Sequence, residues 1–145
     1  GKRMNKVVDD ECIFCKLADG DIPTNAIYED EDFKVIMDAS PASKGHCIIL
    51  PKTHAKDLME LPEEYCSKIM LVAKKCSSVL MKVLHCDGIN VLQNNGEAAG
   101  QTVFHLHVHL IPRYADDTVQ ITWKEHADEM DLKALAEEIK KGFED

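Results

Sequence analysis

The chain has 145 residues, and its 45% hydrophobic and 30% charged residues are the composition of an ordinary globular protein rather than a disordered one. This length suits a single domain. The net charge of −9, from 17 Lys and Arg against 26 Asp and Glu, would repel a nucleic-acid backbone and an anionic membrane surface, so neither is an expected partner. A small phosphorylated ligand is compatible with this charge, because local donors and dipoles can override it.

No basic-then-apolar segment typical of a secretion signal is found near residue 1, so we expect none, and no stretch approaches the ~20 apolar residues of a membrane span. Residues 1–3 precede Met4 and are expected to be a cloning remnant, which leaves 4–145 as the domain. We expect a protein of the reducing cytoplasm, where a Cys-x-x-Cys pair such as Cys12 and Cys15 is typical of a metal or redox site. The other cysteines have apolar neighbours and are expected to be small buried hydrophobes: Cys47, Cys66, Cys76 and Cys86.

Residues 26–51 have the pattern of β-strands. Phe33, Val35 and Met37 recur at every second position, and HCIILP at 46–51 is a short apolar run. SPASKG at 40–45 has the composition of a turn. The segment therefore predicts strands on both sides of a turn.

Residues 62–86 predict one long amphipathic helix. Pro62 suits the first helical position, and Glu63 and Glu64 suit the positive N-terminal end. Apolar residues then recur at steps of three and four: Ile69, Val72, Ala73, Cys76, Val79, Leu80, Val83 and Leu84. This stripe is wide for a domain of this size, so we expect most of it in the core and part of it in a subunit contact.

The segment 88–94 (GINVLQN) is another strand candidate, and 94–102 (NNGEAAGQT) is a polar loop. A final helix is expected to begin at Asp131 and to bury one apolar side: Leu132, Leu135, Ala136 and Ile139. Because strands flank a long helix without regular alternation, the pattern predicts an antiparallel α+β domain.

Three of the seven histidines lie in FHLHVHLIPRY, residues 104–114. In a strand, His105, His107 and His109 would share one face at spacings of roughly 6.5–7 Å. The residues between them would turn an apolar face to the core: Phe104, Leu106, Val108 and Leu110. Pro112 is expected to end the strand.

Three interpretations of this histidine face compete. It could be a solvated polar face, a metal site built from two or all three rings, or a catalytic site in which one imidazole is nucleophile or base. Cys12 and Cys15 supply two thiolates for tetrahedral zinc, and His54 and the first histidine of the strand are candidates for the other two ligands. If His105 completes a fully ligated structural site, His107 and His109 are left free for chemistry.

The segment HLHVHLI resembles the signature of the histidine triad (HIT) nucleotide-binding superfamily. Three longer segments resemble its Hint-type branch, in the zinc-containing bacterial-type form: ECIFCKLADGDIP at 11–23, MDASPASKGHCIILPKTH at 37–54 and NVLQNNGEAAGQTVFHLHVHLIPR at 90–113. The resemblance implies a HIT-like α+β fold, with an antiparallel sheet of about five strands, one long helix and a C-terminal helix. It also implies a homodimer that joins two sheets, and hydrolysis of a bond to a nucleoside monophosphate, with purine nucleoside phosphoramidates as the expected substrates.

The resemblance also implies roles for individual residues. His107 corresponds to the nucleophile that attacks phosphorus, His109 to the residue that binds the phosphate oxygen, and Asp38 to the residue that holds the ribose hydroxyls. The loop around the phosphate and the leaving group corresponds to Asn94, Gly100, Thr102 and Val103. The implied zinc ligands are Cys12, Cys15, His54 and His105.

The sequence departs from many Hint-type proteins at Thr102, where they have serine. The hydroxyl is retained, so Thr102 or His109 could give a proton to an amine leaving group, and the extra methyl could restrict the substrates. We expect a neutral His107 to attack phosphorus and a charged His109 to stabilise the transition state.

Structural interpretations compete with these roles at several positions. Asp38 could simply begin the following turn, and Asn94 to Gly96 could be an ordinary tight turn. His46 is expected to support the triad or to be a buried structural histidine. Trp123 is expected to be an ordinary packing residue, or to lie at a subunit contact or at the rim of the active site.

Three further functions are carried as alternatives. The nearest is hydrolysis of dinucleoside polyphosphates. The second is a nucleotide-binding sensor or adaptor with little turnover. The third is a metal-binding module in which all three triad histidines share one ion, which would leave Cys12 and Cys15 unexplained. The intact middle histidine favours an enzyme over a sensor.

Overall fold

The centre of the molecule is a five-stranded antiparallel sheet with strand order β1-β2-β3-β5-β4. This computed structural model describes residues 6–144, so residues 1–3, the expected cloning remnant, lie outside the described part. The strands are β1 (Ala26–Glu29), β2 (Phe33–Met37), β3 (Cys47–Pro51), β4 (Gly88–Leu92) and β5 (Val108–Arg113). The predicted α+β fold with about five strands is confirmed.

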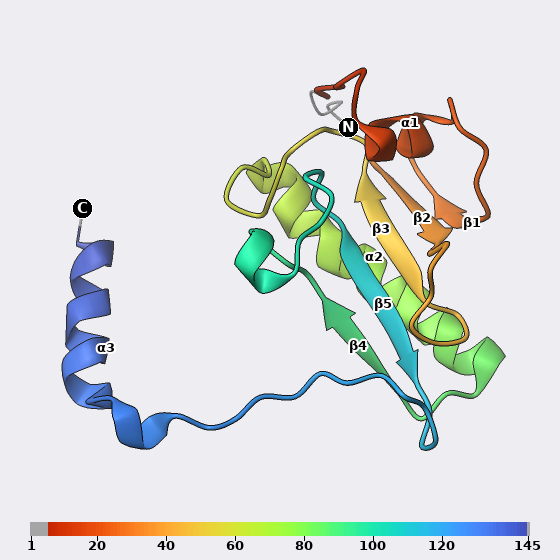
Figure 1. Ribbon diagram of the computed structural model, residues 1–145. Coiled ribbons are helices and arrows are strands. Elements are labelled where there is room, and N and C mark those ends of the chain that lie inside the picture. Colours follow the sequence, from red (N-terminus) through yellow and green to blue (C-terminus); the bar gives the residue numbers. More distant parts are fainter. Residues whose placement is uncertain (1–5, 145) are drawn as a thin grey trace.

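Helix α2 (Glu63–Leu84) crosses one face of the sheet, as Figure 1 shows. Its buried side chains pack on strand residues of the same face, among them Val35, Ile49 and Leu110. Most of the predicted stripe is therefore core, but Val79 and Val83 are exposed. Within the described residues no helix has both the length and the apolarity that a membrane crossing requires.

Helix α1 (Ile13–Asp19) covers the opposite face and was not predicted from the sequence. Cys12 is its N-cap, and Gly20 ends it in the left-handed conformation, with φ 92°, which favours glycine. Its buried side packs on the sheet residues Ile36, Ile48 and Leu50. The Cys-x-x-Cys pair thus lies at the start of a helix that rests on the sheet.

The strand carrying the histidines is shorter and shifted relative to the prediction. β5 begins at Val108, so His105 and His107 lie in the irregular segment before it. Pro112 lies inside β5, opposite Ile89 of β4, and does not end the strand. Its carbonyl accepts a hydrogen bond from the Ser43 hydroxyl at 2.6 Å, on the side away from β4. Because the nitrogen and the carbonyl of one strand residue point to the same side, the Pro112 nitrogen also faces away from β4, and the hydrogen bonds between β4 and β5 are not interrupted.

The apolar side of the histidine segment is only partly as predicted. Leu106, Val108 and Leu110 belong to the core beneath α2, whereas Phe104 is 49% exposed. The predicted role of the other four cysteines is confirmed for Cys47, Cys76 and Cys86, which are buried, while Cys66 is partly buried. All six cysteines are free.

The C-terminal helix forms where it was predicted but does not pack on the body. α3 (Leu132–Lys140) is capped by Asp131, whose carboxylate accepts a hydrogen bond from the Ala134 amide. Contrary to the prediction, its apolar residues are exposed: Leu132, Leu135, Ala136 and Ile139. We call residues 115–144 the C-terminal arm, and Figure 1 shows it leading away from the sheet. The helical pattern indicated an apolar face correctly, but not that the face would lie apart from its own domain.

Candidate functional site

Four side chains from distant parts of the chain meet beneath α1. Sγ of Cys12 and Sγ of Cys15 each lie 3.4 Å from Nδ1 of His105, and Sγ of Cys15 lies 3.5 Å from Nδ1 of His54. All four ligand atoms lie within 4.8 Å of one another, so this cluster could hold a metal ion. It joins the start of α1, the segment after β3 and the segment before β5.

The cluster has the dimensions of a tetrahedral zinc site. Bonds of about 2.3 Å to sulfur and about 2.0–2.1 Å to nitrogen at a tetrahedral angle place sulfur and nitrogen about 3.6 Å apart, close to the separations seen here. The other ring nitrogen of His105 donates to the carbonyl of Pro51 at 3.0 Å, which turns Nδ1 toward the thiols. The donor set therefore fits a divalent ion with mixed sulfur and nitrogen ligands.

Burial favours the uncharged forms of the His105 ring and the Cys15 thiol. It lowers the pKa of His105 to about 4, so the ring is neutral at pH 7 and able to bind a cation. Burial raises the pKa of Cys15 to about 11, so a metal ion would have to displace the thiol proton on binding.

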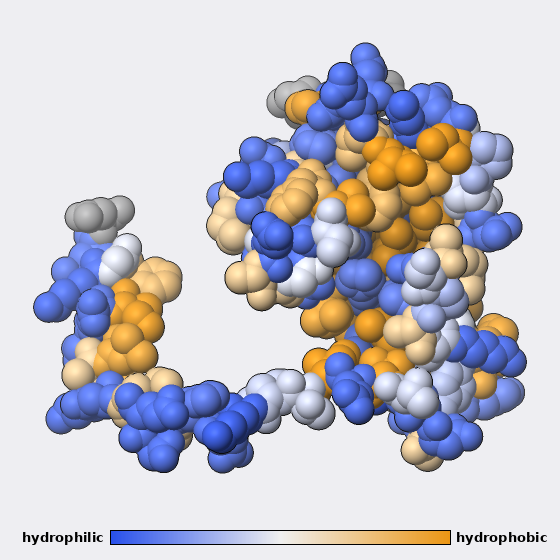
Figure 2. All heavy atoms as spheres, viewed as in Figure 1, coloured by the Kyte–Doolittle hydropathy of each residue, from blue (hydrophilic) through white to orange (hydrophobic). Residues whose placement is uncertain are grey.

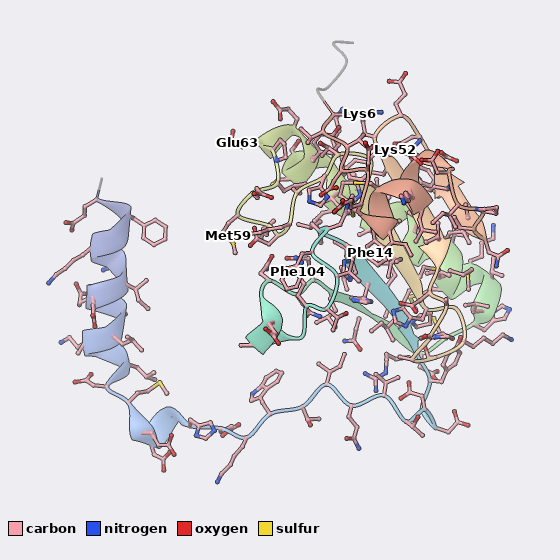
Figure 3. All side chains as sticks on the ribbon, turned by 45° about the horizontal axis from the view of Figure 1, so that its top comes forward. Lys6, Phe14, Lys52, Met59, Glu63 and Phe104 are labelled. Carbon is pink, nitrogen blue, oxygen red and sulfur yellow. The ribbon has the colours of Figure 1, made fainter. Side chains whose placement is uncertain are left out.

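His107 is held with one ring nitrogen committed and the other free. Its Nδ1 lies 2.8 Å from the carbonyl oxygen of His105, and because a carbonyl only accepts, Nδ1 carries the proton and Nε2 the lone pair. Phe14, labelled in Figure 3, lies edge-on to the ring at 4.9 Å between centroids. His107 is 8% exposed, and burial lowers its pKa, so the ring is neutral at pH 7.

A chain of hydrogen bonds sets the tautomers of His46 and His109. The amide of Ala42 donates to Nδ1 of His46 at 2.9 Å, so the proton of neutral His46 lies on Nε2. That nitrogen lies 2.9 Å from Nδ1 of His109, which must then accept. The proton of His109 is consequently on Nε2, the nitrogen that is left for a ligand.

The surroundings of His109 in the free protein disfavour the expected positive charge on its ring. Burial, followed by the neighbouring His107 and His46, lowers the pKa of His109 to about 4. The carboxylate of Asp38 lies 3.5 Å from Nε2 of His46 and only partly opposes this effect. His109 is therefore a neutral hydrogen-bond donor.

The geometry does not support one ion shared by all three triad histidines. His105 belongs to the cysteine cluster, and His107 belongs to neither group of ligands within the described residues. Asp38, His46 and His109 are close enough to hold a cation. However, Nε2 of His46 carries a proton as long as Nδ1 accepts from Ala42, and this proton takes the place of an ion.

A cavity of about 350 Å³ is lined in part by Phe14, the ring that lies edge-on to His107. Its walls are mostly apolar and come from α1 and the sheet: Phe14, Leu17, Ile36 and Ile48. Asp38, at the end of β2, lies on its edge. The Asp38 carboxylate also accepts from the Ser40 amide at 2.7 Å, so this residue both begins the turn and borders the cavity.

The polar loop before the histidines is tied down by Gln101, which the sequence analysis missed. This side chain is 2% exposed; it accepts from the Gly96 amide at 2.8 Å and donates to the carbonyls of Lys56 and Val103 at 2.6 and 3.1 Å. Gly100 has φ 96°, and a Cβ there would lie 3.5 Å from the Asn94 amide nitrogen. The loop conformation thus depends on a buried amide and a left-handed glycine.

Thr102 and Val103 lie beside the metal cluster rather than beside Asp38. They line a hollow of about 500 Å³ together with Cys12, Ile13 and His54. Asp38 and Thr102 therefore line different hollows, the first beside Phe14 and the second beside Ile13 of α1. Phe14 had no sequence signal beyond its place between the two cysteines.

The chain matches a known family model and has close relatives. Residues 19–116 match the HIT domain. "Protein hit" of Bacillus subtilis is 40% identical over 136 residues, covering 91% of this chain and 94% of the relative. The adenosine 5'-monophosphoramidase hnt1 of Schizosaccharomyces pombe is 38% identical over 130 residues, covering 88% of this chain and 95% of the relative.

Solved structures resemble the whole fold. The crystal structure of SMU.412c from Streptococcus mutans has a TM-score of 0.90 at 41% identity, covering 99% of this chain and 92% of that one, so the match includes the C-terminal arm. A Zn-bound histidine triad family protein from Mycobacterium smegmatis has a TM-score of 0.72 at 36% identity, covering 91% of this chain and 97% of that one.

Proposed function

Because this chain belongs to the HIT domain family, in its Hint-type branch, we propose that it is a nucleotidyl hydrolase that cleaves purine nucleoside phosphoramidates or related nucleoside monophosphate conjugates. The observation that carries the proposal is the hydrogen bond from His107 Nδ1 to the carbonyl of His105. It leaves a neutral, buried imidazole with a free lone pair on Nε2. Such a nitrogen is a nucleophile, whereas a sensor that only binds a nucleotide would not need one.

The reaction proceeds in two displacements at phosphorus. Nε2 of His107 forms a bond to phosphorus as the bond to the leaving amine breaks, and the amine departs with a proton. Water then attacks the nucleotidyl-histidine, releases the nucleoside monophosphate and restores His107. Two easier steps replace one difficult displacement.

His109 stabilises the charge that gathers on the phosphate oxygens. Its Nε2–H is the available donor because Nδ1 accepts from His46. A neutral donor that is already oriented stabilises developing charge without needing to reorganise. Thr102, at the hollow beside Ile13 of α1, is the proposed donor of the proton that the leaving amine takes.

The cavity beside Asp38 is the proposed nucleoside site. Its apolar walls suit the flat faces of a base, and the Asp38 carboxylate can accept hydrogen bonds from the two ribose hydroxyls. Asn94, Gly100 and Val103 belong to the loop proposed to surround the phosphate and leaving group.

Zinc is the proposed ion at Cys12, Cys15, His54 and His105, in a structural role. The separations fit tetrahedral zinc, and four protein ligands leave no position open for a substrate. A bound ion would supply folding energy by tying α1 to the segment after β3 and the segment before β5. The relative from Mycobacterium smegmatis, whose structure is described as Zn-bound, supports this choice of metal.

The active form is proposed to be a homodimer that joins two sheets. In the strand order β4 is an edge strand, with β5 on one side. Val91 on this strand and Met70 and Met81 on α2, the helix that contacts it, are 44%, 59% and 43% exposed. An apolar surface next to an open strand edge favours pairing with a second copy.

Turnover of a fluorogenic adenosine phosphoramidate, compared with diadenosine polyphosphates, tests the proposal directly. We expect rapid release of the amine and slow or no cleavage of the polyphosphates. Preference for the polyphosphates would assign the chain to the other hydrolase activity, and AMP binding without turnover of either substrate would make it a sensor. Acid quenching during turnover should trap a nucleotide on His107, and its absence would contradict covalent catalysis.

A further inference from the structure

The cysteines at the start of α1 differ from the core cysteines in their access to water. Cys47 and Cys76 belong to the core cluster beneath α2 and are 0% and 3% exposed. Cys12 is partly exposed and lines the hollow of about 500 Å³ beside the metal cluster, while Cys15 is buried. Residues 7–11, just before Cys12, are exposed, and hydrophilic residues dominate the top of the body in Figure 2, where this segment lies. A small polar oxidant therefore reaches Cys12 from solvent.

The two thiols of this pair are close enough to react with each other. The Cys15 amide donates to Sγ of Cys12 at 3.4 Å, and both sulfurs lie 3.4 Å from Nδ1 of His105. Cys12 is the N-cap, with an extended backbone that turns its side chain over the first turn of the helix. Rotation about the side-chain bonds brings two such sulfurs to the bonding distance of about 2.0 Å. Bond formation therefore needs only local movement at the start of α1.

A peroxide supplies the oxidant that this bond requires. The Cys12 sulfur attacks one oxygen of hydrogen peroxide, the O–O bond breaks, and Cys12 becomes a sulfenic acid as water leaves. The Cys15 sulfur then attacks the Cys12 sulfur, and the hydroxyl departs with the Cys15 proton as a second water. Two thiols and one hydrogen peroxide thus give one disulfide and two waters, and the two electrons lost by sulfur reduce the peroxide. Exchange with a dithiol reverses the reaction.

A disulfide at this place removes two of the four proposed zinc ligands. Zinc is held by thiolates, and sulfurs bonded to each other are no longer thiolates, so only His54 and His105 remain for the ion. The bond also draws the first turn of α1 together. The Cβ atoms of a disulfide lie about 3.5–4.5 Å apart, closer than the roughly 5–6 Å between residues three apart on a helix.

Both changes reach the proposed nucleophile. Phe14 lies between the two cysteines in sequence and is edge-on to the His107 ring at 4.9 Å between centroids. The ring of His105 faces the thiols, and its carbonyl accepts from Nδ1 of His107 at 2.8 Å. His105 precedes β5, so the ladder of that strand does not hold it in place. Movement at the start of α1 and release of the His105 ring therefore act on the same imidazole.

We propose that Cys12 and Cys15 are a reversible oxidation site, where a peroxide forms a disulfide that empties the metal site and loosens α1 beside His107. This inference builds on the proposed zinc site and concerns a modification that the proposed hydrolysis does not require. The Cys-x-x-Cys pair then has two uses, since its thiolates hold the ion and their oxidation releases it.

The test treats the zinc-loaded full chain with hydrogen peroxide and follows its mass, its disulfide-linked peptides and its zinc content together. We expect the loss of two hydrogen atoms, one disulfide joining Cys12 to Cys15, and release of zinc in parallel with that bond. A dithiol should restore both the thiols and zinc binding, and Cys47 and Cys76 should stay reduced throughout. A disulfide between other cysteines, or sulfinic acid with no disulfide, would overturn the proposal.

Two variants separate the pair from general oxidation of the chain. Cys12→Ser should form no disulfide, whereas Cys66→Ser, which removes another partly buried cysteine, should form it within about twofold of the wild-type rate. Because Cys12→Ser also removes a zinc ligand, wild type freed of metal by a chelator gives a second measurement. It should form the same disulfide, since the sulfurs stay adjacent. Failure of that bond to form with and without metal would contradict the inference.

Amide hydrogen exchange measures the effect on α1 without relying on turnover. In the oxidised chain, amides of residues 13–19 should exchange at least tenfold faster than in the reduced, zinc-loaded chain, while those in the middle of α2 stay within about twofold. Equal exchange of α1 in both forms would show that oxidation does not loosen the helix and would overturn the proposal. A reduced chain without phosphoramidase turnover would remove the proposed hydrolysis and leave these results unaffected.

Discussion

Replacing His46 tests whether hydrogen bonding sets the tautomer of His109. His46→Phe keeps a planar ring of similar size but removes both ring nitrogens. Nδ1 of His109 then loses the donor that lies 2.9 Å away, and the Ala42 amide loses its acceptor. His109 is free to carry its proton on Nδ1, which would leave Nε2 with a lone pair pointing at the phosphate.

The size of the effect follows from the groups left unpaired. His46 is 5% exposed, and a buried polar group without a partner costs about 1–3 kcal/mol. Loss of one oriented donor to a transition-state oxygen typically costs about 10²–10³ in kcat. Because His109 is repositioned rather than removed, we expect kcat to fall about 10–100-fold with a smaller change in KM.

The assay is steady-state turnover of the adenosine phosphoramidate by His46→Phe, His46→Gln and His126→Phe. The side-chain amide introduced by His46→Gln can still donate toward His109, so this variant should recover part of the lost kcat. His126 contacts only Glu129 among the described polar partners and serves as the control. Nitrogen-15 spectra of the imidazoles report the tautomers. Unchanged kcat in His46→Phe, or an unchanged His109 tautomer, would refute the reasoning.

The remaining predictions concern the nucleophile, the metal and pH. His107→Ala should lose several orders of magnitude in turnover while binding AMP nearly as before; retention of more than about a tenth of the rate, a loss under ~1.4 kcal/mol, would contradict covalent catalysis. His54→Ala should release zinc and lower the melting temperature, whereas His46→Ala should keep stoichiometric zinc by metal analysis, and the reverse pattern would overturn the ligand assignment. Since burial lowers the pKa of His107 below its ordinary value of 6.5 and lowers that of His109 to about 4, both rings are mostly neutral at pH 6.5, and kcat/KM should fall only in more acidic solution. An acid limb at or above pH 6.5 would contradict this.

The histidine face could be predicted from spacing, but the separate tasks of its rings could not. Alternation brings the three side chains to one side even though only His109 lies in the regular strand. What each ring does depends on contacts with residues far away in sequence. His105 is turned by the Pro51 carbonyl toward the cysteines, and His109 is set by His46. Such partners follow from the folded chain, not from local periodicity.

Short elements explain most of what the sequence analysis missed in the fold. α1 has seven residues, too few for a helical period to stand out, and it carries Phe14 onto His107. Gln101 lies in a loop whose composition indicated only a turn, yet its side chain links three backbone groups. A buried amide in a polar loop has no periodic signal, so only tertiary structure reveals it.

The amphipathic helices show a different kind of limit. A stripe of apolar residues indicates that one side of a helix needs cover, because its exposure to water is unfavourable. The pattern contains no information on which chain supplies that cover. α2 meets its own sheet along most of the stripe but leaves Val79 and Val83 exposed, and α3 leaves its whole stripe exposed. The prediction of the helices was therefore confirmed while the assumption of an internal partner was wrong for α3.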